Sequence, residues 1–131
     1  MANEAFTREE ISLQDGTTIE LRPLTIGKKK KFMRVWTDHI TAVNAELRRA
    51  NLEAEKAKEE GREDEFVFDE TGMTEKQYDT YVKLCAMCLE EIKEDRTEKQ
   101  FASYLEDSLD DPTIFKVLDV CGGLKLGEVP N

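Results

Sequence analysis

The sequence predicts a mainly α-helical fold with a small N-terminal β-hairpin, in which the helices form a bundle that includes one long helix. Three observations favour this fold class. Two short alternating segments flank Asp15-Gly16, a long proline-free stretch repeats apolar residues at helical spacing, and three helix-start signals follow it. A chain of 131 residues is long enough for one core, so we expect a single domain over residues 1–131.

The β-hairpin is expected at about residues 10–22. Residues 11–13 and 18–21 alternate apolar and polar side chains, and Asp15-Gly16 favours a tight turn because glycine tolerates positive φ. Pro23 ends the second strand, since it cannot donate a ladder hydrogen bond. A lone hairpin is only marginally stable in water, so its apolar face must pack on a helix. That face consists of Ile11, Leu13, Ile19 and Leu21.

The long helix is expected from about Lys28 to about Lys58, with Thr25 capping its start. Its apolar residues recur at intervals of three and four and shrink to alanine along the stretch. In one interpretation the first half docks on the domain and the second half projects from it. In the other, the stripe is a coiled-coil or subunit seam. The stripe consists of Phe32, Trp36, Ile40, Val43, Leu47, Ala50, Ala54 and Ala57.

A charged, mobile loop is expected at about residues 58–72, where carboxylates and cations dominate. It contains an apolar island, Phe66-Val67-Phe68. Such an island either holds the loop against the body of the protein or binds a partner.

Three shorter helices are expected to follow, each with a capping pattern at its start. Thr74 and Gln77 have the spacing of a capping box and are expected to open the most buried helix. Thr97 and Gln100 repeat this pattern, and Asp111-Pro112 predicts a last helix with Asp111 as its cap. The helical part is expected to end at Gly122-Gly123, and residues 124–131 to form a loose tail.

The composition argues against several classes of protein. Lys and Arg number 19 against 29 Asp and Glu, giving a net charge of −10, which is opposite to the usual balance of nucleic-acid-binding proteins. The apolar runs are too short to span a membrane, and the N-terminus lacks the basic and apolar regions of a secretory signal. We therefore expect a cytoplasmic protein with reduced thiols, bound to neither nucleic acid nor membrane.

The residues that most often carry chemistry form no catalytic set. Cys85, Cys88 and Cys121 together with His39 have the inventory of a zinc site. However, the Cys85-x-x-Cys88 pair is expected in the middle of an apolar helix, whereas zinc-binding pairs usually lie on tight turns. We therefore interpret the thiols as small core residues and predict no metal, no cofactor and no catalytic residue. His39 has no nucleophile placed beside it by the sequence.

A basic segment, Lys28–Lys31 with Arg34, stands out in this acidic chain. Cations at a helix N-terminus oppose the macrodipole, so we expect that replacing the four lysines does not lower stability. The segment is either a solvated face or a surface for an acidic partner, which would be another copy or a client. The candidate partner-binding residues are Lys28, Lys29, Lys30, Lys31, Arg34, Trp36, Ile40, Val43, Leu47, Phe66 and Phe68.

Two stretches resemble the tail assembly chaperones of long-tailed bacteriophages: Leu13–Gly27, running into the basic helix through Phe32 and Met33, and Pro112–Leu126. The resemblance implies a non-catalytic protein that binds the tape measure protein, keeps it soluble and extended, and promotes polymerisation of the tail tube protein around it. It also implies that the protein acts in the host cell cytoplasm and is absent from the mature virion. It further implies a longer form made by ribosomal frameshifting, of which this chain would be the short form, and self-association is expected.

A different class is the alternative. The charge of −10 and the acidic runs at 46–70 and 89–111 fit an acidic inhibitor that mimics DNA and blocks a nucleic-acid-binding protein. The basic segment argues against it, because a phosphate mimic gains nothing from Lys28–Lys31.

Overall fold

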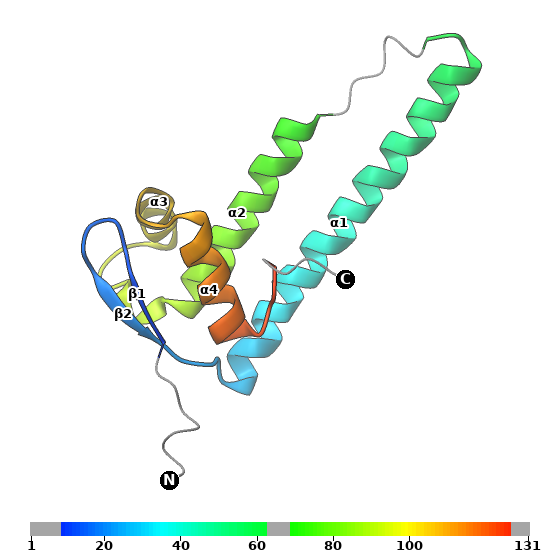
Figure 1. Cartoon of the computed structure of the whole chain (residues 1–131). Helices are drawn as coiled ribbons and strands as arrows, with labels where there is room; N and C mark the ends of the chain where they lie inside the picture. The colour runs from blue at the N-terminus through cyan, green and yellow to red at the C-terminus, as the bar shows by residue number, and fades with distance from the viewer. Residues whose placement is uncertain (1–8, 63–68, 127–131) are drawn as a thin grey trace.

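The computed structural model describes residues 9–62 and 69–126, and in this part the chain is mainly helical with one N-terminal hairpin, as predicted (Figure 1). The long helix exceeds its predicted bounds by two residues at its start and one at its end. The elements in chain order are β1 Glu9–Ser12, β2 Thr18–Leu21, α1 Ile26–Glu59, α2 Glu70–Cys88, the 3-10 turn η3 Glu90–Ile92, α3 Glu98–Ser108 and α4 Asp111–Gly122.

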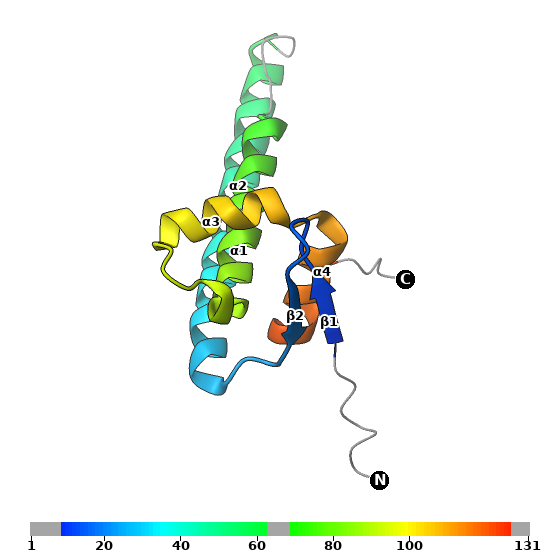
Figure 2. The ribbon, with the colours of Figure 1, turned by 90° about the vertical axis from the view of Figure 1, so that its left-hand side faces the viewer.

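The two strands of the hairpin pair antiparallel, with Ile11 opposite Ile19. Gly16 has a φ of +89°, and the amide of Leu13 donates to the carbonyl of Thr17 at 2.8 Å, which closes the turn at Asp15-Gly16. The four apolar residues of the hairpin are buried, and the hairpin lies against α4 (Figure 2). The predicted need for a helix under the hairpin is therefore met by α4.

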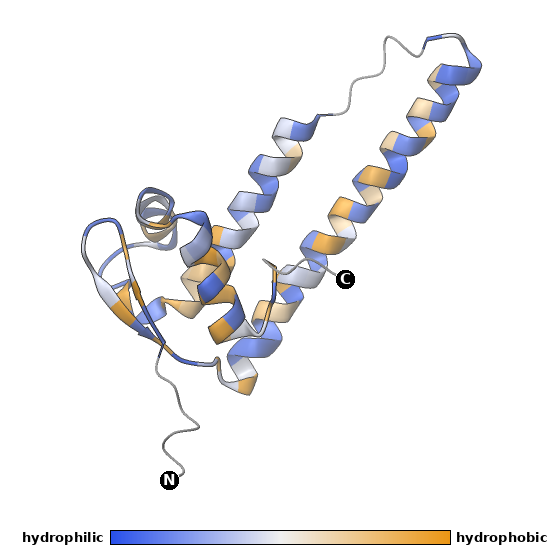
Figure 3. Cartoon of the chain, viewed as in Figure 1, coloured by the Kyte–Doolittle hydropathy of each residue, from blue (hydrophilic) through white to orange (hydrophobic). Residues whose placement is uncertain are grey.

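Helices α1 and α2 run antiparallel and form an arm that extends beyond the rest of the molecule (Figures 1 and 2). At the base of the arm Phe32 is fully buried, whereas Ile40 and Leu47 further along are exposed. The first interpretation of the long helix is thus correct in outline, with α2 lying beside the projecting part. Apolar residues continue along α1 beyond the body (Figure 3).

The start of α2 differs from its prediction. Asp69 is the cap, and its carboxylate accepts from the amide of Gly72 at 2.9 Å. Thr74 lies inside the helix, where its hydroxyl donates to the carbonyl of Glu70 at 2.9 Å. The predicted start at Thr74 is wrong because an aspartate five residues earlier, Asp69, can cap equally well. The predicted loop over 58–72 is also too long, since α1 reaches Glu59 and α2 begins at Glu70.

The last two helices begin and end at specific capping residues. Thr97 and Gln100 form the predicted capping box at α3. At α4 the cap is Asp110, whose carboxylate accepts from Thr113, so the assignment to Asp111 is wrong by one residue. Gly123 ends α4 with a φ of +69°. The amide of Leu124 then donates to Leu118 at 3.0 Å.

The C-terminal tail is less loose than predicted over residues 124–126. Leu124 and Leu126 are partly buried against the core, so this stretch belongs to the body. Residues 127–131 lie outside the described residues, as does the apolar island with Phe66 and Phe68.

The core lies where the base of α1 meets α2, α3, α4 and the hairpin. In the described ranges, no helix combines the length and the apolar character needed to cross a bilayer. The largest fully buried side chains are Phe32, Leu84, Cys85, Leu89, Phe101, Leu105, Val117 and Leu118.

Candidate functional site

The predicted basic segment divides into residues that contact the body and residues that do not. Lys28 forms an ion pair with Glu90, with 3.5 Å between Nζ and Oε2. Lys29 is half-buried, and its ammonium donates to the backbone carbonyl of Gly122. Lys30, Lys31 and Arg34 are exposed and make no ion pair with any part of the chain that the structure describes.

The contact of Lys29 changes the electrostatic interpretation of the segment. Its ammonium lies at the C-terminal end of α4, where unsatisfied carbonyls give a partial negative charge. The unfavourable interaction with the start of α1 is therefore compensated by another helix, 93 residues away in the sequence. Sequence spacing alone could not reveal this, because the compensation is not local.

Trp36 belongs to an aromatic cluster that joins three helices. Its ring stacks on Tyr81 of α2 with 6.4 Å between centroids, and Tyr81 contacts Phe115 of α4 edge-on at 6.3 Å. The predicted partner-binding residue Trp36 is therefore half-buried within the chain itself. This cluster was not predicted from the sequence, because it joins residues of three helices that are far apart along the chain.

His39 extends the aromatic cluster along α1 and makes a polar contact with α2. Its Nδ1 lies 3.2 Å from the hydroxyl of Thr80, which donates to the carbonyl of Lys76 at 3.0 Å. The tautomer of the imidazole sets which of the two groups donates in the contact between His39 and Thr80. Partial burial lowers the pKa of His39, which favours the neutral ring. This contact joins α1 to α2.

Beyond the cluster, α1 carries an apolar surface that α2 covers only in part. Ile40 is 38% exposed and Leu47 is 41% exposed, while Val43 between them is half-buried. Their spacing puts all three on one side of the helix, about 10 Å along its axis from first to last. We call Ile40, Val43 and Leu47 the α1 stripe. Leu52 is 62% exposed but lies on a different side.

The three cysteines lie in the core or at its edge. Cys85 and Cys121 are buried and Cys88 is half-buried, and all three are free thiols. Burial raises the pKa of the Cys85 thiol, which disfavours the thiolate needed to bind metal or attack an electrophile. Within residues 9–62 and 69–126, no three His, Cys, Asp or Glu residues come together as metal ligands.

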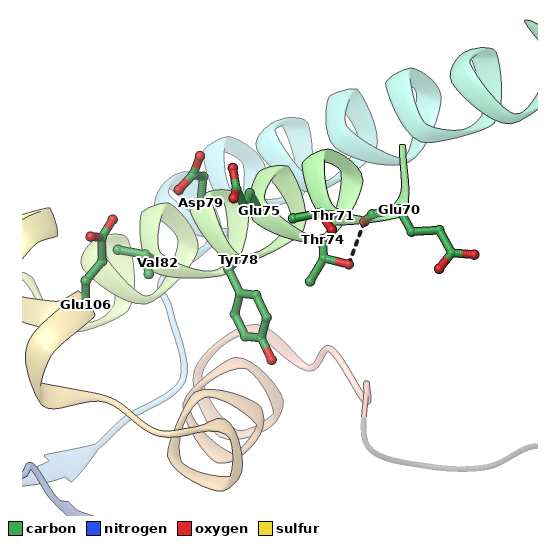
Figure 4. Close-up of a pocket in the computed structure, with 8 residues that line it drawn as sticks. All are labelled: Glu70, Thr71, Thr74, Glu75, Tyr78, Asp79, Val82 and Glu106. Carbon is green, nitrogen blue, oxygen red and sulfur yellow. Dashed lines mark hydrogen bonds between the residues drawn. The ribbon is translucent and has the colours of Figure 1, made fainter. Parts of the chain in front are cut away.

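An open hollow on α2, which the sequence analysis did not anticipate, has a volume of about 540 Å³ (Figure 4). Figure 4 shows the ring of Tyr78 pointing from α2 toward α4 and the carboxylate of Glu106 facing Val82. Four carboxylates line the hollow, and no cation does. We call it the acidic hollow; it is lined by Glu70, Thr71, Thr74, Glu75, Tyr78, Asp79, Val82 and Glu106.

Comparisons with known proteins give no relative. The chain matches no protein-family model, no curated protein and no solved structure. The candidate surfaces of the chain are therefore described from its structure alone. Lys29 and Trp36 pack against the body of the protein, whereas two sets of residues remain accessible. The first is the α1 stripe, and the second is the group of cations at the start of α1.

Proposed function

We propose that this chain is a non-catalytic tail assembly chaperone of a long-tailed bacteriophage. In this role it binds the tape measure protein, keeps it soluble and extended, and promotes polymerisation of the tail tube protein around it. The chaperone then acts in the host cell cytoplasm and is absent from the mature virion. A frameshifted long form of the same chain would be a further partner.

The observation that carries the proposal is the α1 stripe. Ile40, Val43 and Leu47 expose apolar area along a helix that projects from an otherwise strongly charged body. A helical apolar client can place its own stripe along these residues, because side chains at three- and four-residue spacing interlock between helices. Charge on the rest of the surface keeps such a complex soluble.

The spatial arrangement of the two resembling stretches also supports the proposal. Leu13–Gly27 and Pro112–Leu126 are far apart in the sequence but adjacent in the fold. The amide of Leu24 donates to the carbonyl of Cys121 at 2.9 Å, and the hairpin packs on α4. The resemblance therefore involves one contiguous framework at the base of α1, which holds the projecting helix in place.

The test is co-expression with the tape measure protein of the same phage. We expect the tape measure protein to be soluble with this chain and to aggregate without it. Replacing Ile40 and Leu47 with serine should reduce the soluble client several-fold. The matched control, Leu52→Ser, removes an exposed leucine from another side of α1 and should have no effect.

Two outcomes would contradict the proposal. In one, the client stays insoluble in the presence of the parent chain. In the other, the chain displaces DNA from a basic partner with a steep salt dependence, which is the behaviour of a DNA mimic. Equal loss of client with Leu52→Ser would reject the α1 stripe as the binding surface.

A further inference from the structure

Two cysteines from different helices meet at the base of the arm. Cys88 is the last residue of α2, Cys121 is the last but one of α4, and the two helices pack against each other. The thiol of Cys88 donates a hydrogen bond to the sulfur of Cys121. The two sulfur atoms are therefore in direct contact across the interface between α2 and α4. We call Cys88 and Cys121 the thiol pair.

The third cysteine is placed differently. Cys85 is fully buried in α2, three residues before Cys88. Residues at this spacing on one helix have Cβ atoms about 5–6 Å apart, whereas a disulfide needs about 3.5–4.5 Å. The helix thus keeps Cys85 and Cys88 from bonding to each other. Both members of the thiol pair, in contrast, lie in the last turns of two helices, where the backbone adjusts most easily.

The surroundings make the sulfur of Cys121 the better nucleophile of the pair. The thiol of Cys88 and the backbone amide of Arg22 both donate to it, and these hydrogen bonds lower the pKa of Cys121 against the effect of burial. The ammonium of Lys29, which donates to the carbonyl of Gly122, adds positive charge beside the pair. One sulfur is thus favoured as a thiolate while its neighbour remains a thiol, which is the arrangement of a reactive cysteine and its resolving partner.

Access to the thiol pair is narrow. Cys121 is only 3% exposed, whereas Cys88 is half-buried and partly open to solvent. A small neutral oxidant such as hydrogen peroxide can pass Cys88 and reach Cys121. A bulky, charged disulfide such as oxidised glutathione is hindered, because disulfide exchange depends on access to the attacking sulfur.

We propose that Cys88 and Cys121 are a redox-active pair, which hydrogen peroxide converts to a disulfide bond between α2 and α4. In the first step the sulfur of Cys121 bonds to one peroxide oxygen and the O–O bond breaks. The leaving hydroxide takes up the proton that Cys121 gave to solvent on ionising, and Cys121 becomes a sulfenic acid. In the second step the sulfur of Cys88 attacks the sulfenic sulfur and the S–O bond breaks. Hydroxide leaves with the thiol proton of Cys88, so the pair is oxidised by two electrons and the peroxide is reduced to two waters.

The disulfide would fasten the end of α2 to the framework that holds α1. In that framework the amide of Leu24 donates to the carbonyl of Cys121 at 2.9 Å, and the ring of Phe32 packs on Gly122. A covalent bond at this place restricts the unfolded chain and so stabilises the fold. The proposal concerns the chemistry of this chain alone and does not depend on the chaperone function.

Oxidation of the purified, reduced chain by a small excess of hydrogen peroxide near neutral pH tests the proposal. The intact mass should correspond to a single chain of 15.1 kDa that lacks two hydrogens. After alkylation in urea, the peptide map should join Cys88 to Cys121 and carry the alkyl group on Cys85. A thiol reductant should restore three free thiols, and the oxidised chain should unfold at a higher urea concentration than the reduced one. Oxidised glutathione should form the bond at least about tenfold more slowly than peroxide.

Single substitutions test the role of each thiol. Cys85→Ala is the matched control, since it removes a thiol outside the pair, and it should form the same disulfide as the parent. Cys88→Ser removes the resolving thiol and should leave a sulfenic acid on Cys121, which a cyclic diketone labels. Cys121→Ser should leave Cys88 unoxidised under the same conditions. Circular dichroism verifies that each variant is folded.

Three results for the parent chain would overturn the proposal. The native chain keeps all its thiols under peroxide, the cross-link contains Cys85, or the bond joins two chains instead of two helices of one chain. The peptide map of the parent decides among these results without any variant. Oxidation of Cys88 in Cys121→Ser as fast as that of Cys121 in Cys88→Ser would overturn the assignment of Cys121 as the attacking sulfur.

Discussion

The ring of Phe32 in α1 packs directly on the backbone of Gly122 in α4. A Cβ atom added to Gly122 would lie less than 3.0 Å from three ring atoms of Phe32. Phe32 is fully buried, so its ring has no free space into which it can move. Gly122 therefore allows α1 and α4 to pack together, whereas Gly123, with its positive φ, ends α4. From the sequence alone, both glycines were predicted to end the last helix.

The first prediction concerns this contact. Gly122→Ala should lower the free energy of unfolding by about 1–3 kcal/mol, because an extra methyl group overpacks the contact with Phe32. Urea denaturation followed by circular dichroism measures the change. Gly27→Ala is the matched control, since a Cβ atom there meets nothing within 4 Å. It should leave stability unchanged or raise it by up to about 1 kcal/mol. Equal stability of the Gly122 variant and the parent would contradict the packing role.

The second prediction separates Lys29 from its neighbour. Lys29→Gln removes a charged donor from the end of α4 and should cost about 1 kcal/mol of unfolding free energy. Lys30→Gln removes an exposed cation and should cost nothing. This revises the expectation that all four lysines can be replaced without loss. Urea denaturation of both variants provides the comparison, and indistinguishable midpoints would show that the Lys29 contact contributes nothing.

The positions of most helices and strands were predicted well, because turns and helix caps depend on residues that are close together in the sequence. The hairpin follows from Asp15-Gly16 and alternation, and α3 follows from the box at Thr97 and Gln100. The predicted start of a helix was wrong where two residues could each act as its cap. Asp69 caps α2 although Thr74 has the better-known pattern, and Asp110 caps α4 although Asp111 precedes the proline.

The candidate site was less predictable because it depends on contacts between distant parts of the chain. Nothing near Lys29 in the sequence indicates the carbonyl of Gly122, and nothing near Trp36 indicates Tyr81. The acidic hollow requires α2 and α3 to meet at Val82 and Glu106. From the sequence, Ile40 and Leu47 were named only as candidate partner-binding residues on the apolar stripe, and their exposure became visible in the structure.

The third prediction distinguishes the true cap from the residue that only resembles one. Thr97→Ala removes an acceptor for the amide of Gln100 and should cost about 1 kcal/mol. Thr74→Ala should change stability by less than half as much, because alanine is favourable inside a helix and Thr74 contacts only the preceding turn. Thermal unfolding of both variants would show two clearly different midpoints. A larger loss for Thr74→Ala would mean that α2 starts at Thr74.

The fourth prediction concerns the thiols. Burial raises the pKa of Cys85, and a hydrogen bond to Cys121 together with burial raises that of Cys88. Both thiols are therefore protonated at about pH 8, where a free cysteine is partly ionised and reactive. An aromatic disulfide reagent should label Cys85 and Cys88 slowly in the native chain, and all three cysteines rapidly in urea. Mass spectrometry of the labelled peptides identifies each site. Rapid native labelling of Cys85 would contradict its place in the core.

The last prediction uses the contact between the hairpin turn and α3. The hydroxyl of Tyr104 donates to the carboxylate of Asp15 at 2.6 Å, and this hydrogen bond, with others from Thr17, lowers the pKa of Asp15. A carboxylate whose pKa is lower in the folded state stabilises the fold above its unfolded pKa. That contribution is lost as the pH falls through the folded pKa. Tyr104→Phe should therefore raise the pKa of Asp15 toward its ordinary value.

The two observables for this prediction are independent of each other. Carbon-detected NMR titration follows the carboxyl carbon of Asp15 directly in the parent and in Tyr104→Phe. Urea denaturation at about pH 6 and about pH 3 should show a smaller acid-induced loss of stability in the variant. In an Asp15→Asn background the position no longer titrates, so the effect of Tyr104→Phe should be the same at both pH values. An unchanged titration of Asp15 in Tyr104→Phe would sink the prediction, because it would mean that the hydroxyl does not stabilise the carboxylate.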